Sequence, residues 1–219
     1  MARDEEISRC FVNSLNNTVT TTAPYDHWIV ENSLPKNECD ALKELPFPEP
    51  QPLEKSGTRE ANNATRVYFD TDNQKQFNIC SDIAAAFQSD AVVSAIQTKC
   101  GTNLDGSYLR IEYAQDIDGF WLVPHTDIGP KLFTMLLYIS DNPQHAELGT
   151  DIYADEETHF GRSPFSPNTS MIFIPSDHSW HGFEPREIHG VRKSVIINYV
   201  TADWRAREQL AFPDRPISS

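Results

Sequence analysis

The sequence predicts a mainly β fold with helices in its N-terminal half. Two patterns carry this prediction. Residues 1–105 contain helix-like segments separated by loops, whereas residues 106–201 contain short strand-like segments separated by turn-forming residues. The composition agrees, because 219 residues with 39% hydrophobic and 11% aromatic side chains suffice for one globular domain with a core.

The N-terminal half supplies the predicted helices. These are Pro35–Leu45, Cys80–Phe87 and Asp90–Lys99, with one strand at Arg66–Phe69. Ser33 suits the N-cap of the first helix, Pro46 follows its end, and Gly101 suits the end of the last. Residues 46–56 are rich in proline and glutamate and predict a surface loop.

The second half supplies the strands. They are predicted at Tyr108–Ala114, Leu132–Ile139, Asp151–Tyr153, Ser170–Ile174 and Arg192–Val200, followed by a closing helix at Ala202–Leu210. Helices followed by many short antiparallel strands predict a double-stranded β-helix, a jelly roll of the cupin-like kind, supported by the helices. We expect one domain over 1–219, with helical support at 1–105, a catalytic core at 106–201 and a tail at 202–219.

Charge and cysteine content restrict the partners. The net charge of −14, from 18 basic and 32 acidic residues, disfavours nucleic acid. No apolar run approaches the length of a membrane span, and the N-terminus has no secretory signal. The cysteines Cys10, Cys39, Cys80 and Cys100 are widely spaced, which predicts reduced thiols in a cytoplasmic protein. The oligomeric state cannot be read from the sequence.

A metal site is predicted around Pro124-His125-Thr126-Asp127. Residues i and i+2 of an extended segment point to the same face, so His125 and Asp127 can bind one ion. His181 is a third candidate ligand, and His178 competes with it. Two histidines and one carboxylate form the facial triad typical of non-haem Fe(II) oxygenases. The remaining histidines are expected to be surface or structural residues.

A dicarboxylate-binding strand is predicted after the last candidate ligand. Arg192, Ser194 and Asn198 share one face of the Arg192–Val200 strand, between apolar neighbours. Polar side chains on such a face suit a lined cavity better than a dry core. A fixed guanidinium there can bind a carboxylate through two hydrogen bonds.

These residues resemble the 2-oxoglutarate/Fe(II) dioxygenases, specifically the prolyl-4-hydroxylase-like branch, over Tyr108–Tyr199. The similar motifs are Tyr113 with Gly119-Phe120 and Pro124–Asp127, Leu136–Ser140, Phe173–Ser176, His181–Pro185 and Arg192–Ser194. Ala146–Thr150 departs from the family, which usually has a Gly-Gly-Glu-like turn there. The proline four residues after His181 favours His181 over His178 as the third ligand.

The resemblance implies a set of roles. Fe(II) would be held by His125, Asp127 and His181, and O₂ would be the second co-substrate. 2-Oxoglutarate would be bound by Arg192, Ser194, Tyr138 and Tyr113. Ascorbate is expected as a possible reductant. The expected substrate pocket comprises Phe120, Trp121, Asn198 and Arg110, and Asp116 and Asp118 in the preceding loop are candidates to contact a cationic group.

Three functions are consistent with these residues. The favoured one is an oxygenase that hydroxylates a small molecule, such as an amino acid, a peptide-derived metabolite or a natural-product intermediate, with release of succinate and CO₂. The alternative is a prolyl-type protein hydroxylase. The third is a metal-binding jelly roll without oxygenase activity, against which Arg192, Ser194 and Tyr138 argue.

Overall fold

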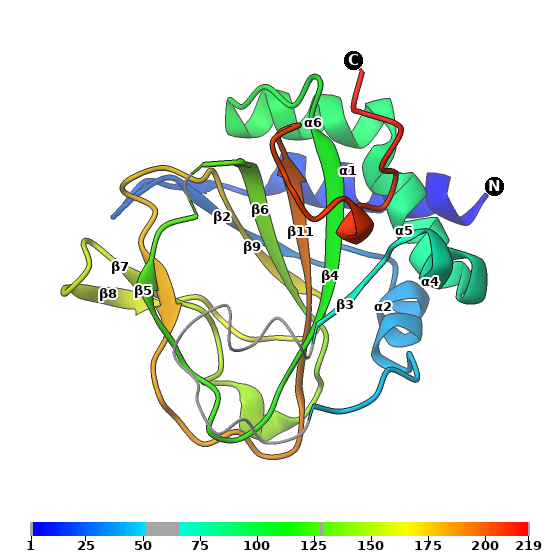
Figure 1. Cartoon of the computed structure of the whole chain (residues 1–219). Coiled ribbons are helices and arrows are strands. Elements are labelled where there is room, and N and C mark those ends of the chain that lie inside the picture. Colours follow the sequence, from blue (N-terminus) through cyan, green and yellow to red (C-terminus); the bar gives the residue numbers. More distant parts are fainter. Residues whose placement is uncertain (1, 51–65, 128, 219) are drawn as a thin grey trace.

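The computed structural model describes residues 2–50, 66–127 and 129–218. The helices precede most of the strands along the chain (Figure 1). They are α1 (Arg3–Asn17), α2 (Lys36–Lys43), α4 (Thr71–Gln76), α5 (Asn78–Gln88) and α6 (Asp90–Cys100), with short 3₁₀ turns η1 (Pro143–His145) and η2 (Arg207–Gln209). Ser89 caps the start of α6, and Gly101 ends it with a left-handed conformation at φ 67°.

The strands of the described residues form two antiparallel sheets. The major sheet has the order β1-β2-β9-β6-β11-β4-β3, and the minor sheet has the order β5-β10-β7-β8. Their bounds are β1 Thr20–Thr21, β2 His27–Glu31, β3 Val67–Tyr68, β4 Tyr108–Asp116, β5 Leu122–His125, β6 Lys131–Tyr138, β7 Asp151–Tyr153, β8 His159–Arg162, β9 Thr169–Phe173, β10 His181–Phe183 and β11 Arg192–Val200. This arrangement confirms the predicted jelly roll with N-terminal helices.

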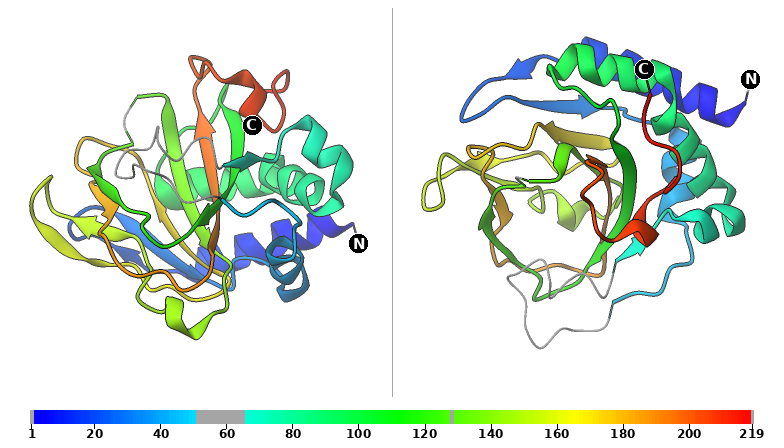
Figure 2. Two further views of the ribbon diagram at one scale, coloured as in Figure 1. Left: turned by 60° about the horizontal axis from the view of Figure 1, so that its bottom comes forward. Right: turned by 45° about the horizontal axis from the view of Figure 1, so that its top comes forward.

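The helices cover one face of the major sheet, and the minor sheet lies toward its other face (Figures 1 and 2). Alternation along β11 explains the two faces. Val195, Ile197 and Tyr199 belong to the core shared with the helices. Ser194 and Ile196 instead line a cavity between the sheets.

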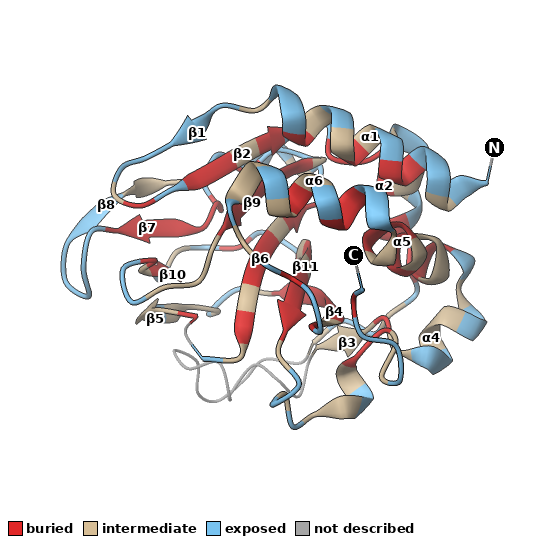
Figure 3. Ribbon diagram, turned by 90° about the horizontal axis from the view of Figure 1, so that it is seen from above, coloured by how far each residue is buried: buried red, intermediate tan, exposed pale blue. Residues whose placement is uncertain are grey.

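Helix α1 shows how the helical layer is held. Ile7, Phe11 and Leu15 recur at intervals of four residues and are fully buried. The ring of Phe11 lies 4.9 Å from the ring of Phe87 on α5. Helices α1 and α6 each have a buried side and an exposed side, whereas α5 is buried or half-buried over nearly all of its length (Figure 3).

Two predictions about the ends of elements were wrong. Ala202–Leu210 forms only the turn η2, because Leu210 and Ala211 pair with the backbone of β4 instead of continuing a helix. Ser33 does not cap α2, since its hydroxyl bonds Ser170 at 2.7 Å and the helix begins after Pro35. Residues 51–56 of the predicted loop lie outside the described residues, and 46–50 have no regular structure.

Among the described residues, no single helix is long and apolar enough to cross a membrane. Helices α5 and α6 pass that test only together, and they are bent by 55° at the break between them.

Candidate active site

His125, Asp127 and His181 meet at one end of the cavity. Their donor atoms all lie within 4.8 Å of one another. Strands β5 and β10 bring them together, because His125 and His181 are paired residues in the register of the minor sheet. Each Nε2 atom lies 3.9 Å from a different oxygen of Asp127.

Backbone hydrogen bonds orient both imidazole rings. Nδ1 of His125 lies 2.9 Å from the carbonyl oxygen of Val123, and Nδ1 of His181 lies 2.9 Å from that of Ser179. A carbonyl oxygen only accepts, so each Nδ1 carries the proton and donates it. Each Nε2 then keeps its lone pair directed toward the carboxylate, as a metal ligand requires.

Asp127 is held by two neighbours on β6. Lys131 Nζ lies 2.7 Å from Oδ1, and the hydroxyl of Thr134 donates to Oδ2 at 3.2 Å. These contacts fix the carboxylate beside the histidines. Two neutral nitrogens and one carboxylate oxygen, gathered in this way, fit Fe(II) as a facial donor set.

The pKa of His181 is lowered to about 3, first because the ring is buried and second because His125 is close. The proximity of Asp127 opposes this shift without overcoming it. The ring is therefore neutral at physiological pH. A neutral imidazole needs no deprotonation before it can bind a metal.

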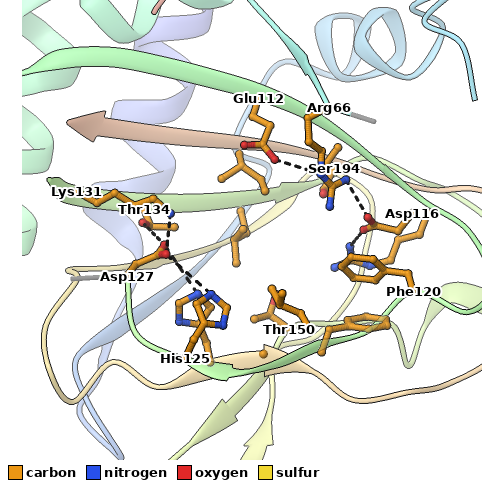
Figure 4. A pocket seen from close by; sticks show the side chains of 18 residues that line it. Arg66, Glu112, Asp116, Phe120, His125, Asp127, Lys131, Thr134, Thr150 and Ser194 are labelled. Atoms are coloured by element: carbon orange, nitrogen blue, oxygen red, sulfur yellow. Dashed lines mark hydrogen bonds and ion pairs between the residues drawn. The ribbon is translucent and has the colours of Figure 1, made fainter. Parts of the chain in front are cut away.

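A cavity of about 100 Å³ connects the three donors to a charged end (Figure 4). Its lining comes from β4, β5, β6, β10 and β11, with Arg66 and Phe120 at the side away from the metal donors. The lining residues are Arg66, Glu112, Ala114, Asp116, Phe120, Leu122, His125, Asp127, Lys131, Thr134, Leu136, Thr150, His181, Gly182, Phe183, Arg192, Ser194 and Ile196.

Arg192 and Ser194 both line this cavity, as the sequence predicts. The guanidinium of Arg192 donates through Nε to the carbonyl of Leu148 at 2.9 Å and through Nη1 to Asp116 at 2.6 Å. The rings of Tyr138, Phe165 and Phe183 surround it, with centroids 4.8–5.7 Å from Cζ. The charge is thus fixed in place at the end of the cavity.

Tyr138 lies next to Arg192 but behind the lining. Its hydroxyl is within hydrogen-bond distance of Thr150 Oγ1 at 2.8 Å and Ser163 Oγ at 2.6 Å. Thr150 itself lines the cavity. Tyr138 therefore reaches the cavity through Thr150.

Tyr113 lies on the opposite face of β4. Its hydroxyl donates to the carbonyl of Leu42 at 3.1 Å, and its ring contacts Phe47 in the helical core. This placement does not agree with the expectation that Tyr113 binds 2-oxoglutarate. Ala114, the next residue, faces the cavity instead.

The four expected substrate-pocket residues separate into two groups. Phe120 lines the cavity, and its ring lies 5.3 Å from that of Phe183. Trp121 is half-buried and is not among the described lining residues. Arg110 and Asn198 are fully buried outside the cavity, where Arg110 Nη1 donates to Asn198 Oδ1 at 3.1 Å.

Asn198 nevertheless connects to the metal donors. Its Nδ2 donates to Thr134 Oγ1 at 3.0 Å, and Thr134 donates to Asp127. Arg110 also bonds Glu112 at 2.5 Å and Gln209 at 2.8 Å. Arg110 and Asn198 therefore lie behind the wall of the cavity and are not part of its lining.

Sequence reasoning missed the charged pairs that flank the cavity. Arg66 contacts Glu112 at 3.3 Å and Asp116 at 2.8 Å. Asp116 was expected in a loop, but β4 extends to it and pairs it with Arg192 in register. The alternation of Glu112, Ala114 and Asp116 opposite the apolar face of the strand was the available signal.

A second group of possible donors, Asp151, His159 and Glu184, does not suit a cation. Their donor atoms also lie within 4.8 Å of one another, although His159 was expected to be a surface or structural residue. Asp151 already pairs with Arg162 and Arg186, and these cations would repel a metal ion. His178, the rejected ligand candidate, has a side chain that is 81% exposed and faces Asp177.

Comparison with known proteins bears on the fold. No protein-family model matches the chain, and no curated protein matches it. Among solved structures, it is similar to a prolyl 4-hydroxylase from Phytophthora capsici, with 15% identity, a TM-score of 0.62 and coverage of 94% of this chain and 68% of that one.

Two further structures show the same similarity. A Trichoplax adhaerens prolyl hydroxylase, solved with a hypoxia-inducible-factor peptide, gives 16% identity and a TM-score of 0.59 over 93% of both chains. A viral collagen prolyl hydroxylase from Paramecium Bursaria Chlorella virus-1, solved with 2-oxoglutarate, gives 14% and 0.54 over 80% of this chain and 96% of that one. At these identities the similarity establishes the fold, which is that of the prolyl hydroxylases.

Proposed function

We propose that the protein is an Fe(II)- and 2-oxoglutarate-dependent oxygenase. The observation that carries the proposal is that three facial metal donors and a buried arginine line the same cavity. A hydrolytic metal site would not require a fixed guanidinium at the far end. The prolyl-hydroxylase fold agrees with this function.

In this proposal, His125, Asp127 and His181 hold Fe(II). Arg192 binds the distal carboxylate of 2-oxoglutarate, and Ser194 and Thr150 offer hydroxyl groups beside it. The iron supplies O₂ activation coupled to oxidation of 2-oxoglutarate to succinate and CO₂. The residues of the chain position the reactants, and the apolar side chains of the lining exclude water.

For the prime substrate, the charged groups of the cavity favour a small polar molecule. Arg66 and Glu112 face the cavity as a buried ion pair that can interact with charged groups. The favoured reaction is therefore hydroxylation of a small molecule such as an amino acid or a peptide-derived metabolite.

Peptidyl proline is the second candidate substrate. It is supported by the structures of the same fold, which are prolyl hydroxylases, one of them bound to a peptide. Amino acids, small metabolites and proline-containing peptides should therefore be screened together. Mass spectrometry of each candidate, in parallel with succinate release, separates the two substrate classes.

The class itself is tested without a prime substrate. The purified protein with Fe(II), ascorbate and 2-oxoglutarate should release succinate slowly and bind 2-oxoglutarate in calorimetry. Arg192→Gln should weaken 2-oxoglutarate binding at least about 100-fold, because a buried charge-assisted pair is lost, and the variant should still bind the metal. The exposed Arg9→Gln is the matched control. No succinate and no 2-oxoglutarate binding by the wild type would refute the proposal.

A further inference from the structure

The charged end of the cavity contains a carboxylate where the proposed co-substrate carboxylate must bind. Asp116 and Arg192 are paired residues of β4 and β11, and Asp116 Oδ2 lies 2.6 Å from Arg192 Nη1. Asp116 is 3% exposed and Arg192 is 6% exposed. The pair therefore lies almost out of contact with solvent, where charge interactions are strong.

The hydrogen bonds of Arg192 engage one nitrogen of each edge through which a second carboxylate could bind. A carboxylate binds a guanidinium at two points, either through Nε and one Nη or through both Nη atoms. Nε already donates to Leu148, and Nη1 already donates to Asp116. Each mode of approach therefore involves one nitrogen that is engaged.

Of the two partners, only Asp116 can move to another cation. The carbonyl of Leu148 belongs to the backbone. Asp116 Oδ1, in contrast, lies 2.8 Å from Arg66 Nη1, and the Arg66 side chain is 8% exposed. Asp116 thus contacts both guanidinium groups, and Figure 4 shows it beside Arg66 at the end of the cavity away from the metal donors. Rotation of the Asp116 side chain toward Arg66 would release Arg192 without leaving a buried carboxylate unpaired.

We propose that Asp116 competes with the distal carboxylate of 2-oxoglutarate for Arg192, and that Arg66 receives Asp116 when the co-substrate binds. Asp116 is then a residue that sets co-substrate affinity. This inference rests on the proposed function. It differs from a purely structural role, in which Asp116 holds Arg192 in the orientation needed for binding.

The two roles predict opposite effects of Asp116→Asn. If Asp116 competes, the variant should bind 2-oxoglutarate about 10-fold tighter or more, because a like charge is removed from a shared guanidinium. If Asp116 only orients Arg192, the variant should bind more weakly. The exposed Asp214→Asn changes the net charge equally and should leave the affinity as it is in the wild type.

Calorimetric titration of the Mn(II)-loaded protein measures these affinities without turnover. 2-Oxobutyrate, which lacks the distal carboxylate, should bind wild type and Asp116→Asn equally. Arg66→Gln provides an independent test, because it removes the second partner of Asp116. Arg66→Gln should weaken 2-oxoglutarate binding at least about 5-fold and leave 2-oxobutyrate binding unchanged. This variant keeps the proposal testable even if Asp116→Asn fails to fold.

The outcomes separate this proposal from the one on which it rests. Absence of 2-oxoglutarate binding by the wild type would overturn both. Wild-type binding that is unchanged or weakened in Asp116→Asn would overturn the competition alone. Unchanged binding in Arg66→Gln would likewise overturn the role of Arg66 as the alternative partner.

Discussion

Gly182 occupies the contact between the two strands that carry the histidine ligands. A Cβ atom at this position would lie 2.9 Å from the carbonyl oxygen of Leu122, and 3.2 Å from both Val123 O and Pro124 N. All three are backbone atoms of β5, so no flexible side chain can move aside. Gly182→Ala should therefore push β10 away from β5.

The required movement can be worked from these distances. Ordinary van der Waals contact begins at 3.4 Å, so the closest contact must open by 0.5 Å and the others by 0.2 Å. Metal–ligand distances are tolerant to about 0.2 Å. We expect Gly182→Ala to lower metal affinity by about 10- to 100-fold, and to lower the free energy of unfolding by about 1–3 kcal/mol.

Titration of Mn(II) by calorimetry and urea unfolding of the metal-free protein measure the two effects. Gly161→Ala is the matched control, because a Cβ at Gly161 on β8 meets no atom within 4 Å. The control should keep wild-type metal affinity. If Gly182→Ala loses stability yet binds Mn(II) as tightly as the wild type, then the spacing of β5 and β10 does not set the ligand geometry.

Three further predictions follow from the same site. Gly149→Ala would place a Cβ 1.8 Å from the carbonyl oxygen of Ser163. The backbone must then shift beside Thr150, which lines the cavity, so calorimetry should show 2-oxoglutarate binding weakened by about 100-fold. Wild-type affinity in this variant would show that the position of this segment does not set 2-oxoglutarate affinity. In the metal-free protein, the unfolded chain takes up a proton on His181 below its ordinary pKa of 6.5, whereas the folded chain does so only near 3. The free energy of unfolding should therefore fall by a few kcal/mol as pH decreases from 6.5 toward 3. Urea unfolding of His181→Asn should show a smaller decrease over the same pH range. An equal decrease in the variant would show that groups other than His181 cause the pH dependence. His181→Ala should abolish Mn(II) binding and His178→Ala should preserve it, and the reverse result would show that the ligand was chosen wrongly.

The metal donors were predictable because their signal is local. His125 and Asp127 are two residues apart on an extended segment, so the sequence alone places them on one face. His181 required a choice, which the resemblance supplied through Pro185. The structure brings all three within 4.8 Å.

The alternation of side chains along β4 also argued against a cavity-facing position for Tyr113. The strand pattern groups Tyr113 with Leu109 and Ile111, and all three are buried in the helical core. A residue on that face cannot also line the cavity. The resemblance suggested a role that the periodicity of the strand had already disfavoured.

The ion pairs at the charged end of the site could not be predicted, because they depend on register between distant strands. Asp116 meets Arg192 only because β4 runs two residues beyond its predicted end and pairs residue by residue with β11. Arg66 approaches from before β3, fifty residues earlier along the chain. No local pattern states which of several acidic residues will oppose a given arginine.

Charge balance in the cavity connects the metal end to the co-substrate end. Among the described lining residues, the cationic side chains are Arg66, Lys131 and Arg192, and the carboxylates are Glu112, Asp116 and Asp127. These groups pair with one another in a largely buried space. A divalent cation alone adds two uncompensated charges, and a dicarboxylate alone adds two of the opposite sign. Each ligand restores the balance that the other disturbs, so each should increase the affinity of the site for the other by the same factor.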